Sequence, residues 1–158
     1  MTTAELKLEA KHIRKTILKL ISQTSSSHVG SCFSIVDILT VLYHNILEIS
    51  DSNDSNRDIF ILSKGHAAVA LYAALASRGF ISPELLDTYA RDGSKLAGHV
   101  IKGSAPGIEA TAGSLGHGLP ILAGFALANK DNNRKFYGVL GDGECNEGSV
   151  WEAASFCS

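Results

Sequence analysis

Two short, unbroken apolar runs constrain the fold of this chain more than any other feature. Ile59–Leu62 and Phe136–Leu140 contain β-branched and aromatic residues, without the polar alternation of a half-exposed strand. Such runs are typical of strands buried on both faces of a parallel sheet. Helical patterns lie before, between and after them, and this alternation indicates an α/β fold. We therefore predict two buried strands in a parallel sheet flanked by helices, with the sheet incomplete at the C-terminus.

Two predicted capping boxes mark the starts of the first helices. Thr2 with Glu5, and Ser34 with Asp37, each place a hydroxyl three residues before a carboxylate. This spacing lets each side chain bond the backbone at the other's position. Apolar residues then follow at helical spacing. Further helices are expected over residues 65–78, 83–89 and 119–129, and from residue 149 onward.

Composition and charge exclude several classes of protein. The 158 residues carry 14 Lys and Arg against 16 Asp and Glu. No basic run is present, which excludes a nucleic-acid-binding footprint. The odd cysteine count, with Cys32, Cys145 and Cys157 far apart, fits neither a disulfide framework nor a zinc site. The longest apolar run, Ala67–Ala76, is too short to span a membrane. We expect one domain or part of one, cytoplasmic and without membrane contact.

A carboxylate lies between two glycines at the end of the second predicted strand. In open α/β sheets, ligands bind beyond the carboxyl ends of the strands, where Gly141-Asp142-Gly143 is expected. The glycines let the backbone approach a bulky anion, and a carboxylate there can hold Mg²⁺ against phosphates. The triplet alone fits a plain turn with a surface aspartate equally well. No Walker-type lysine follows, which disfavours a nucleotide P-loop.

Four histidines each have a glycine within two positions: His28, His66, His99 and His117. Residues 94–118 hold two of them and six glycines without a clean period, which is typical of a functional loop. An imidazole at such a place titrates near neutral pH. Singly, each also fits a structural loop histidine, and no metal-ligand spacing is present. We interpret Lys64 and Lys102, near these segments, as surface lysines.

Taken in order, these segments resemble five motifs of the transketolase family, whose members use thiamine diphosphate. Residues 27–30 and 63–67 are similar to the first two histidine motifs, and His99 with Glu109 is similar to the third. Residues 113–118 resemble the glycine-rich cofactor loop, and residues 141–148 resemble the opening of the thiamine diphosphate motif.

The resemblance implies roles at the cofactor. Asp142 would bind Mg²⁺ or Ca²⁺, Gly141 would belong to the cofactor-binding turn, and the Gly143 amide would donate to the diphosphate. His66 would hydrogen-bond a diphosphate oxygen. The aminopyrimidine would meet the backbone of Gly113 and Leu115. His117 belongs to the same cofactor loop, where the common family form has glutamine, and the histidine variant favours two-subunit relatives.

The resemblance also implies roles toward substrate and partner. His28 and His99 would line the substrate channel, bond sugar hydroxyls and the carbonyl under attack, and act with His66 as the catalytic histidines. Glu147 would join a carboxylate network across a dimer interface, although a first-turn helix glutamate fits nearly as well. The implied reaction moves a two-carbon ketol unit between sugar phosphates, in carbohydrate metabolism.

The family pattern continues beyond this sequence. Its metal site is completed by an asparagine on the next strand, and a pyrimidine-binding half supplies the glutamate that activates the cofactor. We therefore expect residues 1–158 to be a partial diphosphate-binding domain, without a second domain, that needs further sequence or a partner subunit in a homo- or hetero-oligomer. The alternatives are a 1-deoxyxylulose-5-phosphate synthase-like component, a non-catalytic fragment, and a plain Mg²⁺–phosphate module.

Overall fold

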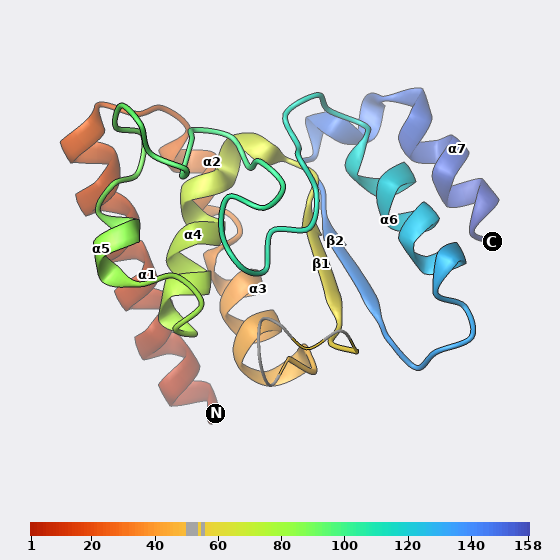
Figure 1. The fold of residues 1–158 in the computed structure, drawn as a ribbon, viewed down its shortest axis with the longest axis horizontal. Coiled ribbons are helices and arrows are strands. Elements are labelled where there is room, and N and C mark those ends of the chain that lie inside the picture. Colours follow the sequence, from red (N-terminus) through yellow and green to blue (C-terminus); the bar gives the residue numbers. More distant parts are fainter. Residues whose placement is uncertain (50–53, 55) are drawn as a thin grey trace.

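A two-stranded parallel sheet lies between two groups of helices (Figure 1). The computed structural model describes residues 1–49, 54 and 56–158. Strand β1 (Ile59–Leu62) pairs in parallel with β2 (Phe136–Val139), with Ile59 opposite Phe136 and Leu62 opposite Val139. The predicted α/β class with a parallel sheet and flanking helices is confirmed.

The helices divide between the two faces of the sheet (Figure 1). One face carries α1 (Thr3–Thr24), α2 (Val29–Phe33), α3 (Val36–Val41), the π-helical turn η1 (Leu42–Ile46), the 3₁₀ turn η2 (Gly65–Ala67), α4 (Ala68–Ser77) and α5 (Pro83–Leu86). The other carries α6 (Gly118–Ala128) and α7 (Gly148–Phe156), with the 3₁₀ turn η3 (Gly143–Asn146) after β2. Residues 94–117 contain no helix or strand, as their glycine content predicts.

Strand β1 is buried on both faces because it separates two apolar clusters. Phe60 and Leu62 belong to the larger cluster, with α1, α3 and α4. Ile59 and Ile61 belong to the smaller one, with Leu122 of α6. Alternate side chains of a strand point to opposite faces, so an unbroken apolar run is what this position requires.

Strand β2 is only half-buried, and its Gly138 is exposed, so the prediction of a second fully buried strand is wrong. The physical reason is its place in the sheet. Within the described ranges, β2 has β1 on one side and no strand on the other. A strand with one neighbour leaves one edge uncovered.

The first predicted capping box is confirmed and the second is wrong. Thr2 Oγ1 accepts the Glu5 amide, and the Glu5 carboxylate accepts the Thr2 amide. At α3 the N-cap is Ile35, without a side-chain cap, and Ser34 Oγ donates to the Ser31 carbonyl.

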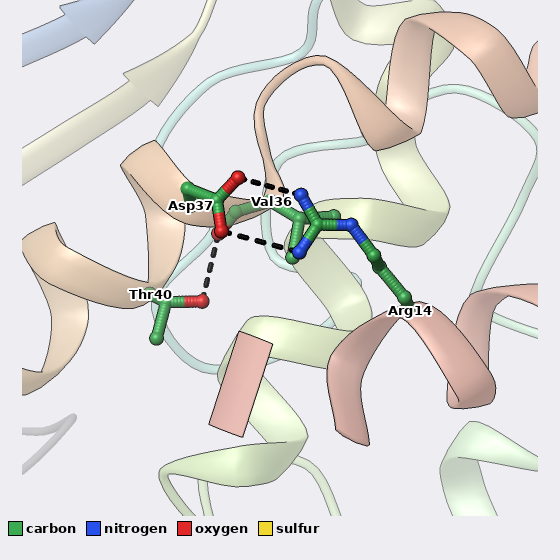
Figure 2. Close-up of polar contacts among 4 residues, drawn as sticks. All are labelled: Arg14, Val36, Asp37 and Thr40. Carbon is green, nitrogen blue, oxygen red and sulfur yellow. Dashed lines mark hydrogen bonds and ion pairs between the residues drawn. The ribbon is translucent and has the colours of Figure 1, made fainter. Parts of the chain in front are cut away.

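Asp37 does not cap α3, because its carboxylate binds Arg14 of α1. The Arg14 guanidinium donates to both Asp37 oxygens, at 3.1 and 2.6 Å (Figure 2). A two-pronged, charge-assisted pair is stronger than a neutral cap. It lowers the pKa of the Asp37 carboxyl, chiefly through these hydrogen bonds. Nearby, Thr40 Oγ1 donates to the Val36 carbonyl at 2.7 Å (Figure 2).

One stretch, Val29–Ile46, is long and apolar enough to cross a membrane by composition alone. In the fold it forms α2, a turn at residues 34–35, and then α3, which continues directly into η1. Its buried apolar side chains belong to the larger apolar cluster, and Asp37 within it pairs with Arg14. A third of the stretch is buried in the fold, and Val29, Ile38 and Ile46 are among its exposed apolar side chains.

Gly65 is a position where the fold tolerates no side chain. A Cβ there would lie 2.3 Å from the Ala112 carbonyl oxygen. We predict that Gly65→Ala lowers the free energy of unfolding by about 1–3 kcal/mol, the usual cost of overpacking, as measured by urea denaturation.

Gly124→Ala is the matched control, because no atom lies within 4 Å of a Cβ at this helical position. It should stabilise the chain by roughly 0.5–1 kcal/mol, because glycine is a poor residue inside a helix. Equal free energies of unfolding for the two variants would contradict this packing.

Candidate active site at the carboxyl edge of the sheet

The segments that follow the two strands leave the sheet at the same edge. Leu62 and Val139 are register partners at the strand ends, so residues 63–66 and 140–143 both begin there. Figure 1 shows this edge at the top, with the loop that precedes α6 passing beside it. A Cβ on Gly141 would lie 3.8 Å from Lys64 Cβ, so the two segments are in contact.

Three of the predicted histidines meet, although they come from three distant segments. The rings of His28 and His66 have centroids 5.1 Å apart, and those of His28 and His99 are 6.3 Å apart. His28 and His99 also line a hollow of about 270 Å³ together with Ser25, Ser26, Ser27, Tyr89 and Gly98. The convergence gives three imidazoles that can act on one ligand.

Backbone geometry and a buried tyrosine hold two of these histidines. His28 adopts φ +71° at the N-cap of α2, a left-handed conformation that costs energy for a residue other than glycine. Tyr72 of α4 donates its hydroxyl to the carbonyls of Ala97 and His99, at 3.1 and 3.3 Å. Burial of this phenol raises the pKa of Tyr72 to about 12, so it remains a donor.

The glycine-rich loop lies against the histidine cluster. A Cβ on Gly113 would lie 3.4 Å from His99 Cδ2. At the other end of the loop, the Gly118 amide donates to Ser63 Oγ at 3.1 Å. The loop is therefore fastened to the segment after β1 and touches His99.

The surroundings of His66 shift its titration. Burial lowers the pKa of His66, and the neighbouring charges of His28 and Lys64 lower it further. The folded protein thus favours a neutral His66 ring, which donates a hydrogen bond through one nitrogen and accepts through the other.

Asp142 and Gly143 form the exposed part of the turn after β2. Both are exposed, and no hydrogen bond or ion pair of the Asp142 carboxylate occurs within the described ranges. A Cβ on Gly143 would meet nothing within 4 Å, so its backbone is open to a ligand. A free carboxylate beside an open backbone suits a hard divalent cation and the phosphate oxygens that it bridges.

The protein ligands for such a cation are few. Among the residues that the structure describes, no group of three or more His, Cys, Asp or Glu side chains could hold a metal. Mg²⁺ commonly keeps one or two carboxylates and takes its other ligands from phosphates and water. Asp142 with a bound diphosphate fits that pattern.

The predictions did not include Glu144, the buried centre of this edge. It is 1% exposed, and its carboxylate accepts hydrogen bonds from Ser63 Oγ and from the amides of Gly116 and Gly141. The available signal was a second carboxylate in the glycine-rich turn after β2, two residues after Asp142.

The remaining predicted residues lie around the start of α7. His117 bonds the Leu115 carbonyl through Nδ1, at 2.9 Å. It faces a groove of about 580 Å³ between α6 and α7, not the histidine cluster. Glu147 is the exposed N-cap of α7, and Gly116 packs against it with φ +81°. The proposed roles of His117, Leu115 and Glu147 stay predictions.

Two charged residues near the motifs differ in environment. The interpretation of Lys64 as a surface lysine is wrong, because it is 6% exposed and its Nζ donates to Ser34 Oγ at 3.3 Å. It lies two residues after β1, and its ammonium group reaches the C-cap residue of α2. Lys102 is exposed, as expected.

Glu109 pairs with Arg57, just before the start of β1.

Comparison with known proteins identifies the class to which this fold and site belong. Residues 6–158 match the family model described as transketolase, thiamine diphosphate binding domain. The chain therefore belongs to the transketolase family, and the resemblance drawn from the five motifs is confirmed at that level.

Two relatives of this chain are named as subunits of transketolases. The chain is 45% identical over 155 residues to one subunit of the apulose-4-phosphate transketolase of Actinobacillus succinogenes, covering 95% of this chain and 56% of the relative. It is 42% identical to the SqwG subunit of the 6-deoxy-6-sulfo-D-fructose transketolase of a Clostridium species, covering 96% and 57%. The chain thus spans about half the length of these curated relatives.

A solved structure has the same fold. The transketolase of Campylobacter jejuni superposes with a TM-score of 0.89 at 30% identity, covering 99% of this chain and 26% of that one.

The charge of Lys64 provides a test of the cluster's electrostatics. We predict that His66 titrates below 6.5 in the folded chain, followed by NMR of its ring protons. Lys64→Met should raise this midpoint, because it removes a nearby positive charge. Lys102→Met, at an exposed position, should leave it unchanged. A wild-type midpoint above 6.5, or a lower midpoint in Lys64→Met, would contradict the geometry.

The same shift has a consequence for stability. Because the folded-state pKa of His66 is depressed, its neutral ring stabilises the fold at pH values above the unfolded-state pKa. That contribution should be lost as the pH falls through the folded-state value.

Proposed function

We propose that this chain is the diphosphate-binding component of a thiamine diphosphate-dependent transketolase, which transfers a two-carbon ketol unit between sugar phosphates. The observation that carries the proposal is the meeting of His28, His66 and His99 at the carboxyl edge of the sheet. Family membership supports the cofactor, and the exposed Asp142 beside an open glycine backbone supports a divalent cation with it.

Each residue has a task that suits its environment. Asp142 holds Mg²⁺ or Ca²⁺, and the Gly143 amide and the neutral His66 ring donate to the diphosphate. His28 and His99, both exposed beside one hollow, bond the hydroxyls and carbonyl oxygen of the sugar. Donors aimed at that oxygen stabilise the negative charge that develops on it. When bound, thiamine diphosphate supplies the nucleophilic thiazolium carbon.

The active enzyme includes a partner. Two relatives are subunits by name, and the chain spans 56% and 57% of their length. We propose that a pyrimidine-binding half, on a separate subunit or in further sequence, completes the site in a cytoplasmic homo- or hetero-oligomer. The substrates named for these relatives carry a phosphate or a sulfonate, and sugar phosphates are the donors and acceptors proposed here.

A 1-deoxyxylulose-5-phosphate synthase-like role is less well supported. The relatives and the solved structure described above are transketolases. An active component differs from a fragment that retains only the fold by its ketol transfer, which is measured with the partner present.

Asp142→Asn is the central substitution. With the partner half present, we predict at least a hundredfold loss of ketol transfer and a similar loss of thiamine diphosphate affinity in Mg²⁺, measured by coupled assay and calorimetry. The fold should be unaffected, because the Asp142 carboxylate is exposed and makes no hydrogen bond or ion pair among the described residues. Asp92→Asn, also exposed but in the loop after α5, is the matched control.

Three outcomes would overturn the proposal. Equal ketol transfer by Asp142→Asn and wild type would remove the assigned metal ligand. Nucleoside diphosphates binding as tightly as thiamine diphosphate would indicate a plain Mg²⁺–phosphate module. Absence of ketol transfer by the wild-type chain with a competent partner would indicate a non-catalytic fragment.

A further inference from the structure

Glu144 joins three segments that meet at the carboxyl edge. Its Oε1 accepts from Ser63 Oγ, after β1, and from the Gly116 amide in the glycine-rich loop, at 3.0 Å for the amide. Its Oε2 accepts from the Gly141 amide, after β2, at 2.9 Å. The Glu144 side chain therefore bonds the segment after β1, the segment after β2 and the glycine-rich loop that leads into α6.

The hydrogen bonds of Glu144 require that both oxygens of its side chain accept and that neither donates. Ser63 Oγ already accepts the Gly118 amide at 3.1 Å, so the single hydroxyl proton of Ser63 is free to bond Glu144. Two amides and this hydroxyl then offer three donors to the two oxygens of Glu144. Within the described part of the chain, Glu144 makes no ion pair. A buried carboxylate without a paired cation is costly, and here hydrogen bonds offset that cost.

We propose that Glu144 is a positioning residue for the diphosphate site, which fixes the glycine-rich loop and the Gly141–Gly143 turn in place before a ligand arrives. This inference rests on the proposed function. The tethered segments carry Gly113 and Gly143, whose backbones are assigned to the cofactor, and they adjoin His66. Holding such groups in advance lowers the ordering cost of binding. Glu144 itself, being 1% exposed, acts through these neighbours.

Glutamine at position 144 retains the size of the side chain. It replaces one accepting oxygen by an NH₂ group, which can only donate. With its carbonyl toward Ser63 and Gly116, the amide nitrogen would face the Gly141 amide, donor against donor. With the group turned over, the nitrogen would face the Gly116 amide in the same way. Glu144→Gln therefore breaks at least one tether without creating a cavity.

The experiment combines two measurements on the chain with its partner half: amide hydrogen exchange at Gly116, Gly118 and Gly141, and the Kd for thiamine diphosphate in Mg²⁺. For Glu144→Gln we expect exchange at Gly116 or Gly141 to become about tenfold faster and the Kd to rise by about tenfold, the effect of losing one charge-assisted hydrogen bond. At saturating cofactor, kcat should remain within about twofold of wild type, a split that general unfolding would not produce. Glu84→Gln, on exposed α5, is the matched control and should change neither quantity.

A second variant covers the case in which Glu144→Gln does not fold. Ser63→Ala keeps the carboxylate and both of its amide bonds, and it should raise the Kd severalfold while exchange at Gly118 becomes faster. Wild-type Kd in Ser63→Ala, or in a folded Glu144→Gln, would overturn this inference and leave the proposed function standing. Failure of the wild-type complex to bind thiamine diphosphate would overturn both.

Discussion

The parallel pairing of β1 with β2 is the constraint on which the rest of the structure depends. Because Leu62 and Val139 are partners at the strand ends, the two segments that follow must start side by side. One segment contains His66 and the other contains Asp142. An antiparallel pairing would have sent these residues to opposite ends of the sheet, and no shared site could have formed.

Close backbone contacts then bring the remaining segments to the same edge. Gly65 lies so near the Ala112 carbonyl that a methyl group would not fit, and Gly118 meets Ser63 equally closely. The glycine-rich loop is thereby pressed onto the end of β1, where Gly113 touches His99. The glycines of these motifs serve packing at this edge as well as any ligand. Glu144 adds the hydrogen bonds that join the loop to both strand ends.

Local sequence signals predicted the elements well and the long-range interactions poorly. The β1 run has the predicted bounds, Ile59–Leu62, because its burial on both faces leaves a local apolar signature. The second capping box failed because Arg14, distant in sequence, binds Asp37. The half-burial of β2 depends on what neighbours it in the sheet. Lys64 is buried and bonds Ser34 at the end of α2, a contact that no pattern around residue 64 predicts.

In the candidate site too, local sequence signals predicted some residues and long-range contacts determined others. The order of five motifs predicted His28, His66 and His99 as the catalytic histidines, and the fold brings these three rings together. Glu144 was missed because its role exists only when residues 63, 116 and 141 have already met. Sequence motifs predict the residues that would face a ligand. A residue such as Glu144, which holds the motif segments together by hydrogen bonds, is identified only from the structure.

The most direct test of the account uses Mn²⁺ as a paramagnetic substitute for the divalent cation, added with thiamine diphosphate to the chain and its partner half. A manganese ion at Asp142 should broaden the NMR signals of Gly143 and His66 strongly. It should leave those of His12 on α1 sharp. Broadening around α1, or none at the carboxyl edge of the sheet at saturating cofactor, would contradict the central claim that this edge is the diphosphate site.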